Sequence, residues 1–494
     1  MNTTIVVNIA IALLGLTLAN AAETNAKRMN VLFIISDDLR TELGCYASAL
    51  AQTPNLDKLA STGVRFERAY CQYPLCNPSR ASLLTGRHPG TTGVLGNRIW
   101  FGDAHPDFIS LPKHFKNNGY HSIRVGKIFH GGIDDTEAWS ENGQVRTLAG
   151  VPPPATNAPA RRSRAQADAA DPDEASSPIV RGGPALTKEQ RSDRWIVLKG
   201  NGEAHGDYKS ADRAIEYLRQ FKDRPFFLGC GFVKPHSPPE APQRFYDQWN
   251  ADEIPLPPDF ASQPTVPPGF PAGSIRPRNS DLFIDRAATT NEARQMIRAY
   301  LASTAFMDWN AGRVLAALDE LGLREKTIVV LWGDHGYQLG EKGKWSKAGS
   351  LWEQGTRTPF LICDPRQKTN GKSSPRIVQM VDLYPTLVEL CGLPQPAGLE
   401  GRSLTPLLQD PQLPWNHPAY TVWSEDGRYF TGVMVRTERW RYAEYYGRGA
   451  GAMLLEPARD PHELTNRVSD LKYADVVTEL SALVKKYAAG HLPP

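Results

Sequence analysis

The sequence NVLFIIS at Asn30–Ser36 is an unbroken apolar and β-branched run, and Asp37 and Asp38 follow it directly. Such a run is typical of a strand that is buried on both faces of a parallel sheet. Three similar runs occur at 120–125, 225–233 and 327–332. The four runs therefore predict the central strands of one sheet.

A long helical pattern separates the third run from the fourth. Apolar residues recur every three or four positions from Met296 to Leu321, after the possible capping box Thr289-x-x-Glu292, and the pattern stops at Gly322. Strands that alternate with helices predict an α/β fold, with a large mixed, mostly parallel sheet sandwiched by helices.

The composition changes along the chain and suggests its domains. An apolar run at 5–18 ends in Ala19-Asn20-Ala21, which is typical of a signal peptide over 1–21. We therefore expect an exported protein, periplasmic or secreted, with no membrane span in its mature form. Residues 22–411 form the main domain, with an exposed low-complexity insertion at 152–186. Short aromatic segments and a helix at about 474–487 predict a C-terminal α+β subdomain over 412–494, with a small antiparallel sheet.

Bulk charge indicates no class of partner. The 56 basic and 53 acidic residues leave a net charge of +3, which is too small to indicate nucleic acid or an anionic membrane. The six cysteines show no C-x-x-C metal spacing, and in an exported protein their number would allow three disulfides.

Polar residues follow each of the four apolar runs at once, and the ends of parallel strands meet at one edge of a sheet. In chain order they are Asp37 and Asp38, Lys127 and His130, Lys234-Pro235-His236, and Asp334 and His335. Three carboxylates brought together repel one another unless a cation lies between them. A set rich in carboxylates favours a hard ion, Ca²⁺ or Mg²⁺, over zinc. The alternative is that Asp37 and Asp38 only cap the segment that follows.

The most specific motif is CNPSRASLLTGR at 76–87. It matches the sulfatase signature C-x-P-S-R-x-x-x-L-T-G-[RK] at every defined position. Here the sequence resembles the type I sulfatases of the alkaline phosphatase superfamily, and within them it is most similar to the iduronate-2-sulfatase branch. The landmarks of that branch occur in order at 36–40, 126–130, 234–236, 334–336 and 345–347.

The resemblance implies that a formylglycine-generating or sulfatase-maturating enzyme oxidises Cys76 to formylglycine (3-oxoalanine). Water hydrates the aldehyde to a diol. One hydroxyl, bound to the cation, attacks sulfur, and the second hydroxyl later expels sulfate. The implied metal ligands are Asp37, Asp38, Cys76, Asp334 and His335.

The resemblance also implies roles for the other polar residues. Arg80 holds the diol through charged hydrogen bonds. Lys127 and Lys347 neutralise the sulfate oxygens in the transition state. His130 is the base that deprotonates the second hydroxyl, and either His236 or Lys347 is the acid that protonates the leaving oxygen.

Substrate recognition is less defined. Arg98, Trp100 and His105 follow the motif in a region that helps to form the pocket in related sulfatases, although Trp100 also fits a core aromatic. We expect the substrate to be a sulfated carbohydrate, either a polysaccharide or an oligosaccharide. The alternatives are a phosphonate or phosphodiester hydrolase of the same superfamily, and a non-catalytic binder of sulfated glycans whose Cys76 remains a thiol or pairs with Cys71.

Overall fold

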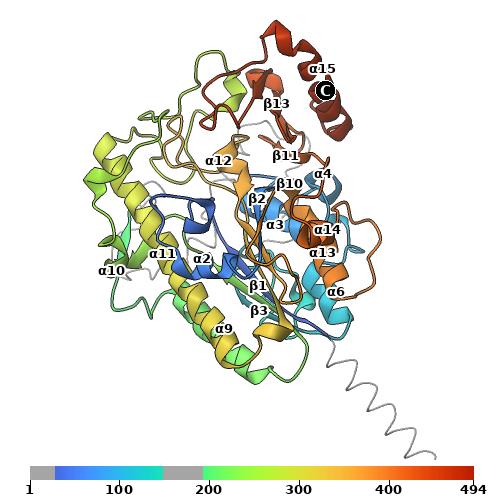
Figure 1. Ribbon diagram of the computed structural model, residues 1–494. Helices are drawn as coiled ribbons and strands as arrows, with labels where there is room; N and C mark the ends of the chain where they lie inside the picture. The colour runs from blue at the N-terminus through green and yellow to red at the C-terminus, as the bar shows by residue number, and fades with distance from the viewer. Residues whose placement is uncertain (1–27, 148–192) are drawn as a thin grey trace, which may run out of the picture.

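The computed structural model describes residues 28–147 and 193–494 (Figure 1). The predicted signal peptide at 1–21 and the predicted insertion at 152–186 lie outside the described residues. Among the residues that are described, no helix combines the length and apolarity needed to cross a membrane.

An eight-stranded sheet forms the centre of the main domain, in the order β10-β2-β9-β7-β1-β5-β3, with β8 paired to β2. The strands are β1 (Asn30–Ser36), β2 (Val64–Tyr70), β3 (His121–Gly126), β5 (Phe226–Phe232), β7 (Thr327–Gly333), β8 (Arg357–Thr358), β9 (Phe360–Cys363) and β10 (Ser373–Gln379).

The four predicted strands are β1, β3, β5 and β7, and they lie side by side and parallel. Ser36, the last residue of β1, aligns with Phe232 of β5 and Gly333 of β7, so the strand ends are level. The remaining strands were not predicted. β2 (VRFERAY) alternates apolar with charged residues, and β9 has four residues and runs antiparallel to both of its neighbours. The predicted α/β fold with a mixed, mostly parallel sheet is confirmed.

Helices cover both faces of the sheet (Figure 1). One face packs against α3 (Cys76–Thr85), α6 (Leu111–Asn117), α13 (Leu383–Leu390) and α14 (Thr405–Gln409). The other packs against α2 (Pro54–Ala60), α9 (Gly206–Gln220) and α11 (Thr290–Glu320). The predicted capping box is present, because the Thr289 and Glu292 side chains each accept the other's backbone N–H at the start of α11. The short helices are α4 (Pro89–Thr92), α5 (Phe101–Ala104), α10 (Gln243–Tyr246) and α12 (Glu353–Thr356).

The C-terminal subdomain, drawn in orange and red in Figure 1, is an antiparallel four-stranded sheet with one helix. Its elements are β11 (Ala419–Trp423), β12 (Gly432–Arg436), β13 (Arg441–Tyr445), β14 (Gly451–Leu455) and α15 (Ala474–Tyr487). β14 was not predicted, whereas the other strands and the helix were. A two-stranded sheet of β4 (Ile196–Leu198) and β6 (Glu240–Pro242) lies apart. All six cysteines are in the described residues and all are free thiols, so the three disulfides that their number would allow do not form.

Candidate active site

The level ends of β1 and β7 bring the predicted carboxylates together. The Asp334 backbone N–H donates to the Ser36 carbonyl across 3.4 Å, and the Asp38 N–H donates to Asp334 Oδ1 across 3.1 Å. Asp38 has a φ of 59°, in the left-handed region that a non-glycine residue adopts only at a cost of about 1–2 kcal/mol. The chain thus holds a strained turn that places two adjacent aspartates beside a third.

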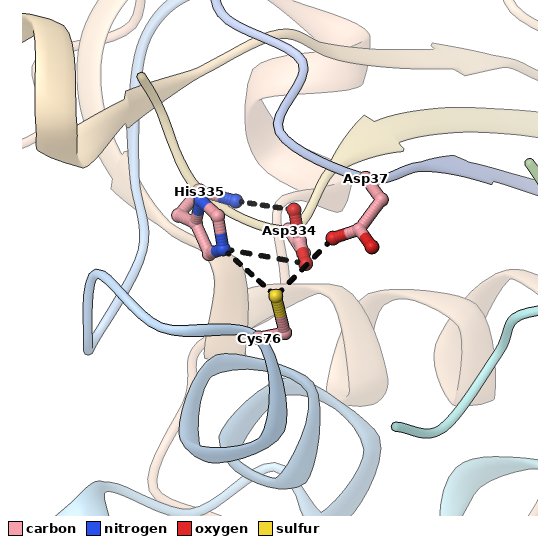
Figure 2. A group of neighbouring side chains, drawn as sticks. All are labelled: Asp37, Cys76, Asp334 and His335. Atoms are coloured by element: carbon pink, nitrogen blue, oxygen red, sulfur yellow. Dashed lines mark hydrogen bonds and ion pairs between the residues drawn. The ribbon is translucent and has the colours of Figure 1, made fainter. Parts of the chain in front are cut away.

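Cys76 is the first residue of α3 and lies in the middle of this group (Figure 2). Its Sγ is 3.3 Å from Asp37 Oδ1 and 3.4 Å from His335 Nε2. Burial and the Asp37 carboxylate raise the pKa of the Cys76 thiol well above its ordinary value. The unmodified thiol therefore stays protonated, while the positive end of the α3 dipole favours an anion at the same place.

The donor atoms at this edge fit a divalent cation. The ligand atoms of Asp37, Cys76, Asp334 and His335 all lie within 4.8 Å of one another, and those of Asp38 and Cys76 form a second such group with His236. Asp38 Oδ1 is buried and accepts no hydrogen bond from the described residues. His335 Nδ1 lies 2.9 Å from the Gly336 carbonyl, so Nδ1 carries the proton and the Nε2 lone pair faces the group. All five predicted metal ligands are thus brought together.

Two basic side chains, Arg80 and Lys127, form ion pairs with the carboxylates. Arg80 is fully buried, with Nη2 3.3 Å from Asp37 Oδ1 and Nε 3.1 Å from Asp334 Oδ2. Its Nη1 donates to the Lys127 carbonyl across 2.9 Å, and Lys127 Nζ is 2.6 Å from Asp37 Oδ2. Burial alone would raise the pKa of Asp37, but Lys127 and Arg80 hold it well below its usual range. Asp37 is therefore ionised.

Lys347 and His236 form a hydrogen-bonded pair beside Asp38. Lys347 Nζ lies 3.0 Å from Asp38 Oδ2 and 3.2 Å from His236 Nε2. His236 Nδ1 is 2.7 Å from the Ser237 carbonyl, so Nδ1 carries the proton and Nε2 accepts from Lys347. Burial and the Lys347 charge lower the pKa of His236 well below its usual value, so the imidazole is neutral and the amine is charged.

His130 is buried in the loop after β3, three residues beyond Lys127. Two further residues belong to the site: Asp281, which the sequence did not indicate, and Lys234, which was predicted at the end of the third run without a role. Asp281 Oδ1 lies 3.4 Å from Lys347 Nζ, and Lys234 Nζ donates to the His236 and Pro238 carbonyls across 3.1 and 2.8 Å. Asp281 follows no apolar run, so no pattern marked it. Lys234 was predicted to lie at this strand end, and the structure adds that it holds the segment that carries His236.

The predicted substrate residues lie at different places. Arg98 follows Asn97, whose side chain accepts the Asn77 N–H at the start of α3. Trp100 packs in the core of the main domain, and its ring centroid lies 4.0 Å from that of Phe101. This agrees with the alternative prediction that Trp100 is a core aromatic. The His105 ring is half-buried and stacks on Phe108. A substrate contact by any of the three stays a prediction.

Comparison with family models gives two matches. The model described as "Sulfatase" matches residues 29–393, and the model described as "N-sulphoglucosamine sulphohydrolase, C-terminal" matches residues 340–489. The first match alone spans well over half of the chain and includes every residue of the site described above.

Relatives agree with these matches. A protein named "Sulfatase" from Formosa agariphila is 32% identical over 474 residues, covering 92% of this chain and 86% of that protein. The iduronate 2-sulfatase of Homo sapiens is 31% identical over 465 residues, covering 82% of this chain and 79% of that protein. The solved phosphonate monoester hydrolase of Agrobacterium radiobacter aligns with a TM-score of 0.72 at 21% identity, covering 94% of this chain and 96% of that one, which shows a shared fold.

Proposed function

Because the chain belongs to the sulfatase family and is a sulfuric ester hydrolase, we propose that Cys76, converted to formylglycine, is its nucleophile and that a sulfated carbohydrate is its substrate. The observation that carries the first part is the position of Cys76 Sγ between Asp37 and His335 at the start of α3. In the mature enzyme an oxygen of the modified side chain would take the place of this sulfur. A hydrated aldehyde supplies one hydroxyl to attack sulfur and a second to expel the sulfate afterwards.

Asp37, Asp38, Asp334 and His335 would hold the cation beside residue 76. The carboxylate-rich donor set supports Ca²⁺, with Mg²⁺ as the other hard ion that suits it. When bound, the ion supplies positive charge that lowers the pKa of a hydroxyl on the nucleophile and neutralises the sulfate ester. The buried Asp38 Oδ1, which accepts no hydrogen bond from the described residues, supports this assignment.

Side chains of the same cluster would manage charge and protons. Arg80 fixes Asp37 and Asp334 and lies close enough to the start of α3 to hold the nucleophile in one orientation. Lys127 beside Asp37 and Lys347 beside Asp38 would place positive charge where sulfate oxygens gain charge in the transition state. The proton for the leaving oxygen would come from the Lys347–His236 pair, with the charged Lys347 as its source. We assign His130 as the base, from its place in the 126–130 landmark.

Support for a carbohydrate substrate comes from the relatives. The human protein that is 31% identical over most of this chain is named for the sugar iduronate, and the second family model is named for N-sulphoglucosamine. We further propose that the protein is exported before it acts, because the apolar run at 5–18 ends in a small-x-small sequence. Export would bring the unfolded Cys76 motif to a maturation enzyme and the folded protein to extracellular glycans.

A peptide mass spectrum tests the nucleophile. Protein made together with a maturation enzyme should give a peptide covering residues 73–80 that is lighter by roughly 18 Da than the encoded one, since a thiol-bearing carbon becomes an aldehyde. Fully active protein whose Cys76 is still a thiol would overturn the proposal.

Assaying an aryl sulfate and an aryl phosphodiester side by side tests the reaction, because a phosphodiester turned over much faster than the sulfate would favour the phosphonate hydrolase alternative.

A further inference from the structure

A cavity of about 390 Å³ lies at the junction between the main domain and the C-terminal subdomain. The main domain contributes the start of α4 and the segment 400–402, and the subdomain contributes the start of β11 and the end of α15. The cavity is not part of the catalytic centre. Cys76 begins α3, whose ten residues span about 15 Å, and His88 on the cavity wall lies three residues beyond the other end of this helix.

Histidines and one arginine dominate the polar wall. His88, His417 and His491 line the cavity together with Arg402. Glu400 is the carboxylate on this wall, and it accepts the His88 N–H and the Thr91 hydroxyl at 2.5 and 2.7 Å, so both of its oxygens are held at the start of α4.

Arg402 is left without such a partner. Its guanidinium forms no ion pair and no side-chain hydrogen bond with the described residues, and it is exposed to the cavity mouth. Partial burial and the Arg402 charge lower the pKa of His417, so the positive charge of Arg402 is felt across the cavity. The wall therefore offers one guanidinium that is in no ion pair with the described residues, one carboxylate, and three imidazoles.

Aromatic rings form the rest of the wall. Tyr420 of β11 stacks on Tyr487 of α15, with centroids 4.2 Å apart and an interplanar angle of 1°, and Phe430 stacks on His491. The Tyr487 hydroxyl and His88 Nδ1 are hydrogen-bonded across 3.0 Å, which fixes that imidazole. These contacts make a preformed hollow from both parts of the chain rather than a gap between loosely placed side chains.

The chemistry of the wall selects a class of ligand. A cavity of this size falls within the range of small-molecule sites, about 300–1,000 Å³, and is larger than a single inorganic anion needs. A metal ion does not fit, because the groups of ligand atoms that converge closely enough among the described residues are those at the catalytic centre. A ring with several hydroxyls and one anionic group matches aromatic walls, imidazole donors and an unpaired guanidinium.

We propose that this cavity is a second carbohydrate site, which binds one anionic sugar unit of a polymeric substrate away from the place where sulfate is hydrolysed. The proposal rests on the proposed carbohydrate substrate and adds to it that the substrate is a polymer. A second contact raises the local concentration of the polymer near the catalytic centre and so lowers its KM without changing the chemical step.

The test replaces Arg402→Gln and His417→Gln together and compares two substrates. For heparin oligosaccharides the KM should rise by about tenfold at unchanged kcat, whereas kcat/KM for a small aryl sulfate should stay within about twofold of the parent. The matched control is Arg219→Gln at the end of α9, an exposed arginine with no side-chain partner among the described residues, on the opposite side of the sheet. Equal melting temperatures of parent and variants establish that the fold is intact, and Arg402→Gln alone serves if the double variant is unstable.

A binding measurement separates this proposal from the proposed function. In the Cys76→Ala background, titration calorimetry with heparin oligosaccharides should show two binding events, and the Arg402→Gln, His417→Gln protein should show one. A single binding event in the Cys76→Ala protein with Arg402 and His417 intact would overturn the second site. An unchanged KM for heparin oligosaccharides in the double variant would overturn it as well. An absence of aryl sulfate turnover in the parent would instead overturn the proposed catalysis while the calorimetric result still stands.

Discussion

Of the buried clusters of charged side chains in the described residues, two can be compared, and one of these two carries the groups for a reaction. The catalytic cluster lies at the ends of β1, β3, β5 and β7. The other, here called the junction cluster, consists of Glu353, Arg436, Arg441 and Glu463 together with Tyr70, and joins α12 and β2 to the C-terminal subdomain. Arg80 in the first cluster and Arg441 in the second are both fully buried.

The clusters differ in how their charges are ordered. In both clusters each acid lies against a base, but the junction cluster balances two carboxylates with two guanidinium groups: Glu353 contacts Arg441, and Arg441 Nε lies 2.8 Å from Glu463 Oε1. Burial would raise the pKa of Glu353, but Arg441 and Arg436 lower it to about 2. In the catalytic cluster burial raises the pKa values of Asp38 and Asp334, and the nearby Asp37 adds to both shifts. In the junction cluster, burial and Glu353 likewise raise the pKa of Glu463. The functional site is therefore distinguished by three adjacent aspartates around a nucleophile, and not by buried charge or a raised carboxyl pKa alone.

The largest effect is expected at the nucleophile. Cys76→Ala should lower kcat for an aryl sulfate by about 10⁴-fold or more, because no other group offers the two hydroxyls that the reaction needs. Within the described part of the chain the Sγ makes two polar contacts, so the urea midpoint of unfolding should change little. Activity above a few per cent of the parent would show that Cys76 is not the nucleophile.

A substitution in the junction cluster should lower the stability of the protein and leave its kcat nearly unchanged. Arg441→Met leaves Glu353 and Glu463 buried without their shared partner, and the free energy of unfolding should fall by about 3–5 kcal/mol. The kcat of the protein that remains folded at low temperature should stay within about twofold of the parent. The matched control is Arg439→Met, whose half-exposed side chain pairs with Glu456 and should contribute about 0–1 kcal/mol. Urea unfolding and an aryl sulfate assay measure both quantities, and a large loss of kcat in Arg441→Met would remove the distinction between the clusters.

Neutralising one crowded carboxylate tests the assigned cation. Asp334→Asn keeps an oxygen for the Arg80 Nε–H but removes one of three adjacent negative charges. We expect a loss of kcat/KM of about 10²-fold, or roughly 3 kcal/mol, because a metal ligand has lost its charge. Chelator-treated parent protein should gain melting temperature when Ca²⁺ is added, whereas the variant should gain little. An equal Ca²⁺-dependent shift in both proteins would contradict the placement of the ion at Asp334.

Much of the catalytic centre could be predicted because its residues follow continuous apolar runs. Strands buried on both faces must be apolar throughout, and parallel strands in one sheet must end at the same edge. The sequence therefore predicted that these strand ends meet and bring together Asp37, Lys127, His236 and Asp334. The 76–87 motif indicated the nucleophile.

The junction cluster could not be predicted in this way. Tyr70 ends a strand with alternating polarity, and Glu353 opens a four-residue helix. Arg441 pairs with Glu353 across 88 positions of sequence, and no local period records such a contact. Asp281 could not be predicted for the same reason, because its loop reaches Lys347 only in the folded chain.

Asp281 gives the smallest expected effect and the sharpest test of the boundary of the catalytic cluster. Lys347 Nζ lies between Asp38 Oδ2 at 3.0 Å and Asp281 Oδ1 at 3.4 Å, so two carboxylates fix its direction. Asp281→Asn should lower kcat for an aryl sulfate by about tenfold, roughly 1.4 kcal/mol, with little change in KM, because a less well oriented ammonium group stabilises the transition state less. Asp281→Glu should restore part of the loss. The control Asp285→Asn changes a largely exposed carboxylate of the same loop that pairs with Arg278, and kcat should not move. If Asp281→Asn behaves as this control does, Asp38 and His236 orient Lys347 without Asp281, and Asp281 lies outside the catalytic cluster.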